Sequence, residues 1–118
     1  MQLREALNEG HALLTLSGSL LCEPDAFTLR QRVYRLVDQQ ILHVIIDLGE
    51  VTYINSCGLG LLISLLTTIR RAGGDLRIAR VGLNVKNLFV VTQLSTIFHT
   101  YESVEAAMAS FAATPSKR

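Results

Sequence analysis

Residues 44–60 constrain the fold of this chain more than any other stretch. An apolar, β-branched run ends in a polar segment, and Ser56 then begins a long apolar segment with helical character. This order predicts a buried strand, a turn and a helix, with the Ser56 hydroxyl at the positive end of the helix dipole. Negative charge is favourable at that end, so the sequence indicates a site for a phosphate group, a bound anion or a nucleophile.

Size and charge limit the classes of protein to consider. The chain has 118 residues, of which 49% are hydrophobic, and a net charge of +1. This length fits one domain that buries about two-thirds of its unfolded surface. The small net charge gives no reason to expect nucleic acid or an anionic membrane as a partner. The N-terminus lacks the apolar segment of a signal peptide, and the apolar stretch at 59–69 is too short to span a bilayer. We therefore expect a cytoplasmic protein without membrane insertion.

The cysteines and carboxylates predict no metal site. Cys22 and Cys57 are too few for a metal or disulfide framework. We expect reduced thiols, with Cys57 as a small packing residue rather than a reactive group. Asp47, at the end of the buried run, is expected to accept hydrogen bonds from the backbone of the following turn. No spacing of ligands or glycines indicates a metal, a nucleotide or another cofactor.

Strand and helix patterns alternate along the chain. Gly18 is expected to end the second strand, Pro24 and Asp25 to open the first helix, and Asn84 and Ser103 to cap the last two. This alternation predicts an α/β fold, in which a sheet is covered by about four helices. We expect one domain at 1–111 and a flexible tail at 112–118. The predicted strands lie at 3–7, 12–16, 42–48, 76–81 and 97–101, and the helices begin near 24, 56, 84 and 103. The strand at 76–81 is expected to be less buried than the one at 42–48.

The predicted helix at 56–72 has a wide apolar arc. On a helical projection its apolar side chains cover about 200°. Part of this arc can pack beneath a neighbouring helix, and the rest can form an exposed patch beside Ser56, as is typical of protein-binding surfaces. The sequence leaves burial and partner binding equally open. The arc consists of Leu59, Leu61, Leu62, Ile63, Leu65, Leu66, Ile69 and Ala72.

Ser56 is a poor candidate for a catalytic nucleophile. The Gly-x-Ser-x-Gly spacing of a nucleophile elbow fails because Ile54 stands where the first glycine belongs. A nucleophilic serine also needs a base, and the histidines His11, His43 and His99 lie in scattered elements. We therefore do not expect an enzyme.

The segment Asp47-Leu48-Gly49-Glu50-Val51-Thr52-Tyr53-Ile54-Asn55-Ser56-Cys57-Gly58-Leu59-Gly60 resembles the signature of STAS domains, the fold of bacterial anti-sigma factor antagonists. The resemblance covers residues 6–111 in element order and length. It implies a mixed, mostly parallel β-sheet with an N-terminal antiparallel hairpin and helices packed against it. It also implies that the third helix and its following loop, at 84–96, lie beside the serine and add to a partner surface.

The resemblance implies that Ser56 is a phosphoacceptor. The partner would be an anti-sigma factor that is also an ATP-dependent serine kinase. The unphosphorylated protein would bind this kinase and so release the sigma factor. A homodimer is left open by the sequence. The residues implied to contact the partner are Asn55, Cys57, Gly58, Leu59, Gly60 and Leu61.

Two positions depart from the family pattern. Asn55 stands where an aspartate usually precedes the serine, and Leu21 stands where an aspartate usually follows the second strand. Glu23 or Asp25 can substitute for the second of these carboxylates. Both departures bear on phosphorylation rather than on the fold. The alternative function is therefore a STAS subunit of a transporter or signalling scaffold that binds without phosphorylation.

Overall fold

The computed structural model describes residues 1–8 and 10–113, and the structure contains five strands, four α-helices and one short 3-10 helix within them. Most of the predicted tail lies outside the described residues, and the last helix ends at Ala113. The elements are β1 (Gln2–Asn8), β2 (His11–Leu20), α1 (Asp25–Asp38), β3 (His43–Ile54), α2 (Ser56–Arg71), β4 (Asp75–Ala79), α3 (Leu83–Val91), η1 (Leu94–Thr96), β5 (Thr100–Tyr101) and α4 (Val104–Ala113).

The five strands form one mixed sheet in the order β1-β2-β3-β4-β5. β1 and β2 pair as an antiparallel hairpin, and every later pair is parallel. The predicted fold class is therefore confirmed. Because β2, β3 and β4 run parallel, their carboxyl ends meet at one edge of the sheet, where α2 also begins.

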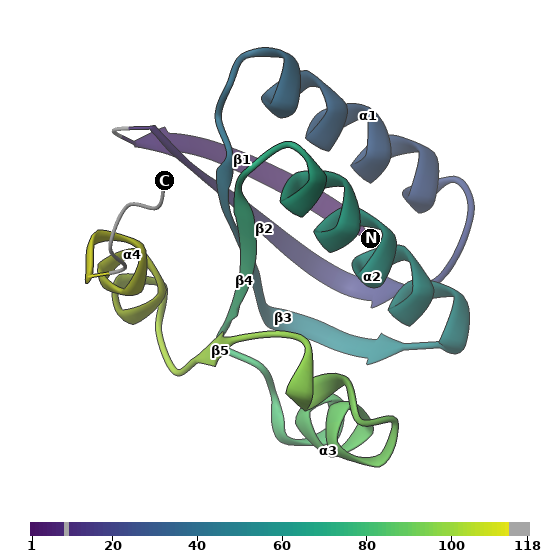
Figure 1. The fold of residues 1–118 in the computed structure, drawn as a ribbon. Helices are drawn as coiled ribbons and strands as arrows, with labels where there is room; N and C mark the ends of the chain where they lie inside the picture. Colours follow the sequence, from purple (N-terminus) through teal and green to yellow (C-terminus); the bar gives the residue numbers. More distant parts are fainter. Residues whose placement is uncertain (9, 114–118) are drawn as a thin grey trace.

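The helices cover the two faces of the sheet unequally (Figure 1). α1 and α2 lie together on one face, where a large apolar core includes Leu29, Leu62 and Ile46. α4 covers the other face through a small cluster that includes Ile45 and Phe111. α3 also contributes Val85 and Phe89 to the large core.

Two strands are longer than the sequence predicts. Gly18 does not end β2, because its positive φ of 89° lies within a register irregularity that the strand passes through. β3 likewise continues through the segment predicted as a turn, and it pairs with β2 as far as Leu20 and Ile54. Both extensions carry the strands to the edge of the sheet at which Ser56 lies.

The prediction that the fourth strand is less buried was wrong. Leu76, Arg77, Ile78 and Ala79 are all buried, because α4 covers the second face of β4. The Arg77 guanidinium lies 4.1 Å above the Phe111 ring and donates to Ser110 Oγ at 2.6 Å. An arginine on this face is therefore a buried residue with partners.

Two predicted helix starts have different outcomes. Ser103 caps α4, since its Oγ accepts a hydrogen bond from the backbone N–H of Ala106 at 3.0 Å. Asn84 lies inside α3 instead of capping it, and the N-cap residue is Gly82.

In the part of the chain that the structure describes, no helix has the length and apolar character needed to cross a membrane.

Candidate functional site around Ser56

Ser56 is the first residue of α2, and only Asn55 separates it from the end of β3 at Ile54. Asn55 is extended, with φ −95° and ψ −179°, and its side-chain oxygen accepts a hydrogen bond from the backbone N–H of Gly58 at 2.8 Å. This is N-capping geometry, which asparagine and aspartate provide about equally well. The asparagine therefore keeps the helix start that the family pattern requires, but without a carboxylate.

The Ser56 side chain is exposed at the positive end of α2. The first turn of this helix holds no acidic residue. Glu23 and Asp25, the predicted substitutes for the missing upstream aspartate, have other partners. Glu23 accepts from the backbone N–H of Phe27 at 3.3 Å, and Asp25 lies 3.7 Å from the N-terminal amine. Ser56 thus combines exposure, a favourable dipole and a helix start without acidic side chains.

Gly58 and Gly60 lie on opposite sides of α2. A Cβ on Gly58 would clash with the backbone carbonyl of Leu20 at the end of β2. A Cβ on Gly60 would meet nothing within 4 Å. Gly58 is therefore required for packing inside the domain, whereas Gly60 leaves an open patch of helix backbone next to Ser56.

The apolar arc of α2 is mostly buried within the domain. Of the residues expected to contact a partner, Leu59 and Leu61 are 7% and 3% exposed and belong to the large core. Ser56, Cys57 and Gly60 are exposed, and Asn55 is half-buried. A partner can therefore touch only the polar and small members of the predicted set directly in this conformation.

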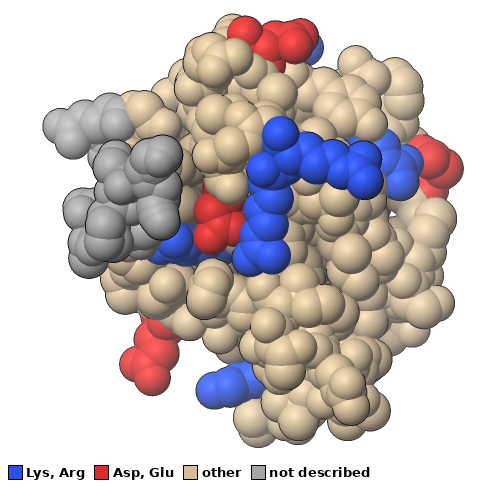
Figure 2. All heavy atoms as spheres, in the orientation of Figure 1, with Lys and Arg blue, Asp and Glu red and all other residues tan. Residues whose placement is uncertain are grey.

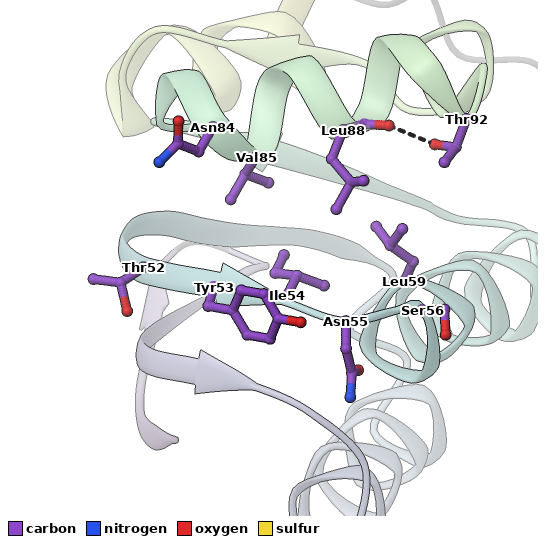
Figure 3. A pocket seen from close by; sticks show the side chains of 10 residues that line it. All are labelled: Thr52, Tyr53, Ile54, Asn55, Ser56, Leu59, Asn84, Val85, Leu88 and Thr92. Atoms are coloured by element: carbon purple, nitrogen blue, oxygen red, sulfur yellow. Dashed lines mark hydrogen bonds between the residues drawn. The ribbon is translucent and has the colours of Figure 1, made fainter.

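A pocket of about 570 Å³ opens beside Ser56 (Figure 3). Its floor is the end of β3 and the start of α2, and its opposite wall is α3. Figure 3 shows Leu88 of α3 pointing toward Leu59 across this pocket, and Val85 pointing toward the end of β3 at Ile54. The lining also includes Tyr53, whose ring is largely exposed. The structure therefore adds an apolar groove to the site, as the resemblance implied for the region of α3.

The outer surface of α3 is apolar as well. Leu83, Val90 and Val91 are exposed large hydrophobic residues, and Val91 reaches 79% exposure. The only charged residue of this helix is Lys86. Figure 2 shows few charged side chains over α3, at the bottom of the view. The sequence predicted a helix and loop at 84–96 but did not distinguish which of its apolar residues are exposed.

The two cysteines differ from their prediction. Cys22, in the loop between β2 and α1, and Cys57, in the first turn of α2, form a disulfide with their Cα atoms 5.5 Å apart. Both residues are exposed, so Cys57 is not a packing residue. The number of cysteines does not predict this pairing, and neither does their spacing, since the two residues are 35 positions apart. The fold brings them together where β2 ends and α2 begins.

Asp47 has the structural role that its position predicts. Its Oδ1 accepts from the backbone N–H of Gly49 at 2.9 Å and from Arg80 Nε at 2.9 Å. The hydrogen bond and the charge of Asp47 raise the pKa of Arg80. Asp47 is buried and therefore helps to fix the middle of β3 rather than to bind a ligand.

The histidines are not gathered at Ser56. His43 is the first residue of β3, and Ser56 lies beyond the other end of this strand, so the length of the strand separates them. The rings of His11 and His43 are 5.3 Å apart, and the His43 ring stacks on Phe111 of α4 at 4.5 Å. These two histidines therefore belong to the packing of α4.

Known proteins resemble the chain over nearly its whole length. A Bordetella bronchiseptica protein named "Putative anti-sigma factor antagonist BtrV" is 28% identical over 103 residues, which are 87% of this chain and 88% of that protein. The crystal structure of an anti-sigma factor antagonist from Mycobacterium paratuberculosis has a TM-score of 0.79 at 20% identity and 92% coverage of both chains. The structure of the Bacillus cell fate determinant SpoIIAA in its phosphorylated form has a TM-score of 0.74 at 13% identity, covering 93% of this chain and 99% of SpoIIAA.

The match to a protein family is equally extensive. The model of the STAS domain matches residues 4–107, which include most of β1, all the later strands and the start of α4. The signature segment predicted from the sequence lies inside this range and forms the end of β3 and the start of α2. The chain therefore belongs to the STAS domain family.

Proposed function

We propose that this protein is an anti-sigma factor antagonist whose binding to an anti-sigma factor kinase is controlled by phosphorylation of Ser56. The observation that carries this proposal is the position of Ser56. It is exposed at the start of α2, between the open backbone of Gly60 and the apolar groove beneath α3. An added charge there lies at the edge of an apolar, accessible surface and outside the core.

A phosphate on Ser56 is expected to change the stability of the fold much less than it changes the free energy of partner binding. A phosphate adds about −1.5 to −2 charges at pH 7. The helix dipole stabilises an exposed anion at this end by about 0.3–1 kcal/mol, so the fold tolerates the modification. A partner that covers the phosphate without pairing it must desolvate the charge, at a cost of several kcal/mol. A loss of about 2.8 kcal/mol already weakens binding about a hundredfold.

The relatives support the general role. BtrV and the Mycobacterium paratuberculosis protein carry the name of anti-sigma factor antagonist, and SpoIIAA has a phosphorylated form. Asn55 is compatible with phosphorylation, because it caps α2 as an aspartate would and a kinase can supply its own catalytic base. We propose that the partner contacts Ser56, Asn55, Cys57 and Gly60 directly, with Gly58, Leu59 and Leu61 holding that surface in place.

The rival function is a constitutive subunit of a transporter or signalling scaffold. The absence of acidic residues from the first turn of α2 favours this rival if a carboxylate is needed to orient the hydroxyl. Such a subunit would bind its partner by the same surface but would not respond to a charge on Ser56.

Affinity purification from the native cells separates the two functions. Tagged wild type, Ser56→Asp and Ser56→Asn are compared, and the retained proteins are identified by mass spectrometry. We expect an ATP-binding serine kinase with wild type and Ser56→Asn, and its loss with Ser56→Asp. Thr67→Asp is the matched control, because Thr67 is an exposed residue of the same helix about three turns away. Retention of the same partner by wild type and Ser56→Asp would instead support the scaffold.

A further inference from the structure

We propose that Cys22 and Cys57 form a reversible thiol–disulfide switch that controls the mobility of the first turn of α2, where Ser56 lies. The two Cα atoms are 5.5 Å apart, a separation typical of disulfides. Both residues are exposed, so oxidants and reductants can reach them. Cys57 follows Ser56 directly, and any change at this pair therefore acts on the neighbour of the proposed phosphoacceptor.

Contacts other than the disulfide already hold the two segments together. The backbone N–H of Asn55 donates to the carbonyl of Leu20 at 3.4 Å, and Gly58 packs closely against the same carbonyl. The carbonyl of Cys22 accepts from the backbone N–H of Ala26 at 2.9 Å, which fixes Cys22 at the start of α1. The two sulfur atoms therefore stay near each other after reduction, and the bond can form again without refolding.

The position of Cys57 also suits the chemistry. A thiolate is the reactive form of cysteine, and the start of a helix favours negative charge. With hydrogen peroxide as the oxidant, the Cys57 thiolate attacks one peroxide oxygen, the O–O bond breaks, and the leaving hydroxide takes up the released thiol proton to become water. The Cys22 sulfur then attacks the sulfenic sulfur of Cys57, and a second water leaves as the S–S bond forms.

This reaction is balanced and reversible. The two thiols lose two electrons and two protons, and one peroxide is reduced to two waters. A small dithiol reverses the step by thiol–disulfide exchange, in which the dithiol becomes oxidised and both cysteine thiols are restored. In reducing compartments, disulfides of this kind are usually transient and redox-sensing.

The closed bond restricts what a kinase can do at Ser56. Phosphoryl transfer requires the acceptor hydroxyl to lie in line with the γ-phosphate, so the helix start that carries Ser56 must adjust to the active site of the kinase. The disulfide ties the residue after Ser56 to the loop before α1 and holds the first turn of α2 in place. A misplacement of about 1 Å is enough to slow a reaction about a hundredfold. The hydroxyl of Ser56 is exposed in the bonded form. Oxidation therefore slows its phosphorylation by fixing the helix start in one geometry, and reduction restores the mobility that the kinase needs.

Hydrogen exchange tests the switch without any partner. Purified full-length wild type is treated with hydrogen peroxide, and a second sample is then reduced with dithiothreitol. We expect the intact mass to fall by two hydrogens and to recover on reduction. We also expect amide exchange at 56–59 to be at least about tenfold slower in the oxidised form. Cys22→Ser should exchange like the reduced wild type under both treatments. Failure of the bond to form or to reopen, or equal exchange in the two forms, would overturn the proposal.

The consequence for phosphorylation rests on the proposed function and is measured separately with the co-purified kinase. We expect that kinase to phosphorylate reduced wild type and Cys22→Ser at Ser56, and oxidised wild type at least about tenfold more slowly. Equal rates for the oxidised and reduced forms would refute the thiol–disulfide switch. They would leave the proposed control of kinase binding by phosphorylation of Ser56 unaffected. Phosphorylation of neither form would instead contradict the proposed function. The hydrogen-exchange measurement alone would then show whether the cysteine pair controls the first turn of α2.

Discussion

The α4 side of the sheet and the Ser56 end of the sheet differ in where charged side chains lie. On the α4 side, Arg77 is buried, but its guanidinium pairs with Asp75 at 3.1 Å, bonds to Ser110 and lies over the Phe111 ring. At the other end, the first turn of α2 has no acidic residue, and the neighbouring groove is largely apolar. Charge is therefore part of the fold on one side, whereas the first turn of α2 and the lining of the groove beside it carry no charged side chain.

The proposed phosphorylation of Ser56 would make use of this difference. A new charge on the α4 side would compete with existing partners and disturb the packing of that helix. A new charge on Ser56 meets no packed charge network, so the fold is spared and the surface changes. The predictions below test this contrast, from the largest expected effect on stability to the smallest.

Loss of the buried charge of the α4 side should have the largest effect. Arg77→Ala removes the buried one of the two arginine partners of Asp75 and the guanidinium that packs on Phe111. We expect the free energy of unfolding to fall by about 3 kcal/mol, as for a broken buried ion pair. Urea denaturation followed by circular dichroism measures this change.

Arg70→Ala is the matched control for that variant. Arg70 contacts the same carboxylate, Asp75, at 3.0 Å, but its side chain is 44% exposed. We expect a loss of no more than about 1 kcal/mol, as for other surface ion pairs. Equal losses for the two variants would contradict the view that burial on the α4 side makes the charge structural.

The two glycines of α2 should respond with opposite signs. Gly58→Ala places a Cβ against the Leu20 carbonyl, and we expect a loss of about 1–3 kcal/mol from overpacking. Gly60→Ala places a Cβ in open space, and the better helix propensity of alanine should add about 0.5–1 kcal/mol. Thermal unfolding of both variants measures the difference. A loss of stability in Gly60→Ala would mean that the surface beside Ser56 is packed rather than open.

The sequence predicts the elements of this fold better than their surroundings. Periodicity locates α1 and α2 well, because Leu29 and Val33 and the apolar arc of α2 follow helical spacing and pack in the core. It underestimates β3, because the buried residues Val51 and Ile54 near its end are separated by polar and exposed ones. A local pattern does not show that β2 continues alongside and supplies hydrogen-bonding partners to that segment.

The candidate site was predictable at one residue and not at its neighbours. The change from strand to helix places Ser56 correctly at an exposed helix start. The disulfide could not be inferred, since it depends on how β2 and α2 meet in three dimensions. Likewise, the burial of Leu59 and Leu61 and the exposure of Val91 depend on which helix faces which layer. Spacing along one helix does not contain that information.

Acidification should lower the free energy of unfolding through His43, which packs on α4. Burial against Phe111, the charge of His11 and the charge of Arg77 lower the pKa of His43, and Asp75 only partly opposes them. Because the unfolded chain then binds the proton more readily, stability is full above the unfolded pKa of about 6.5 and falls as the pH drops through it. Unfolding curves measured from pH 8 to pH 5 should show this fall. His43→Phe should flatten it, and an unchanged slope in that variant would assign the effect to other groups.

The smallest effect on stability is expected where the effect on binding is largest. Ser56→Asp adds a carboxylate at the positive end of α2, so the free energy of unfolding should rise by about 0.3–1 kcal/mol. Ser56→Asn has a similar shape without the charge, and the difference between the two variants isolates the dipole term. This term should shrink in about 1 M salt, where screening acts within about 3 Å. A clear loss of stability in Ser56→Asp alone would show that a charge at this position disturbs the fold, and loss of partner binding by that variant could then no longer be attributed to the surface.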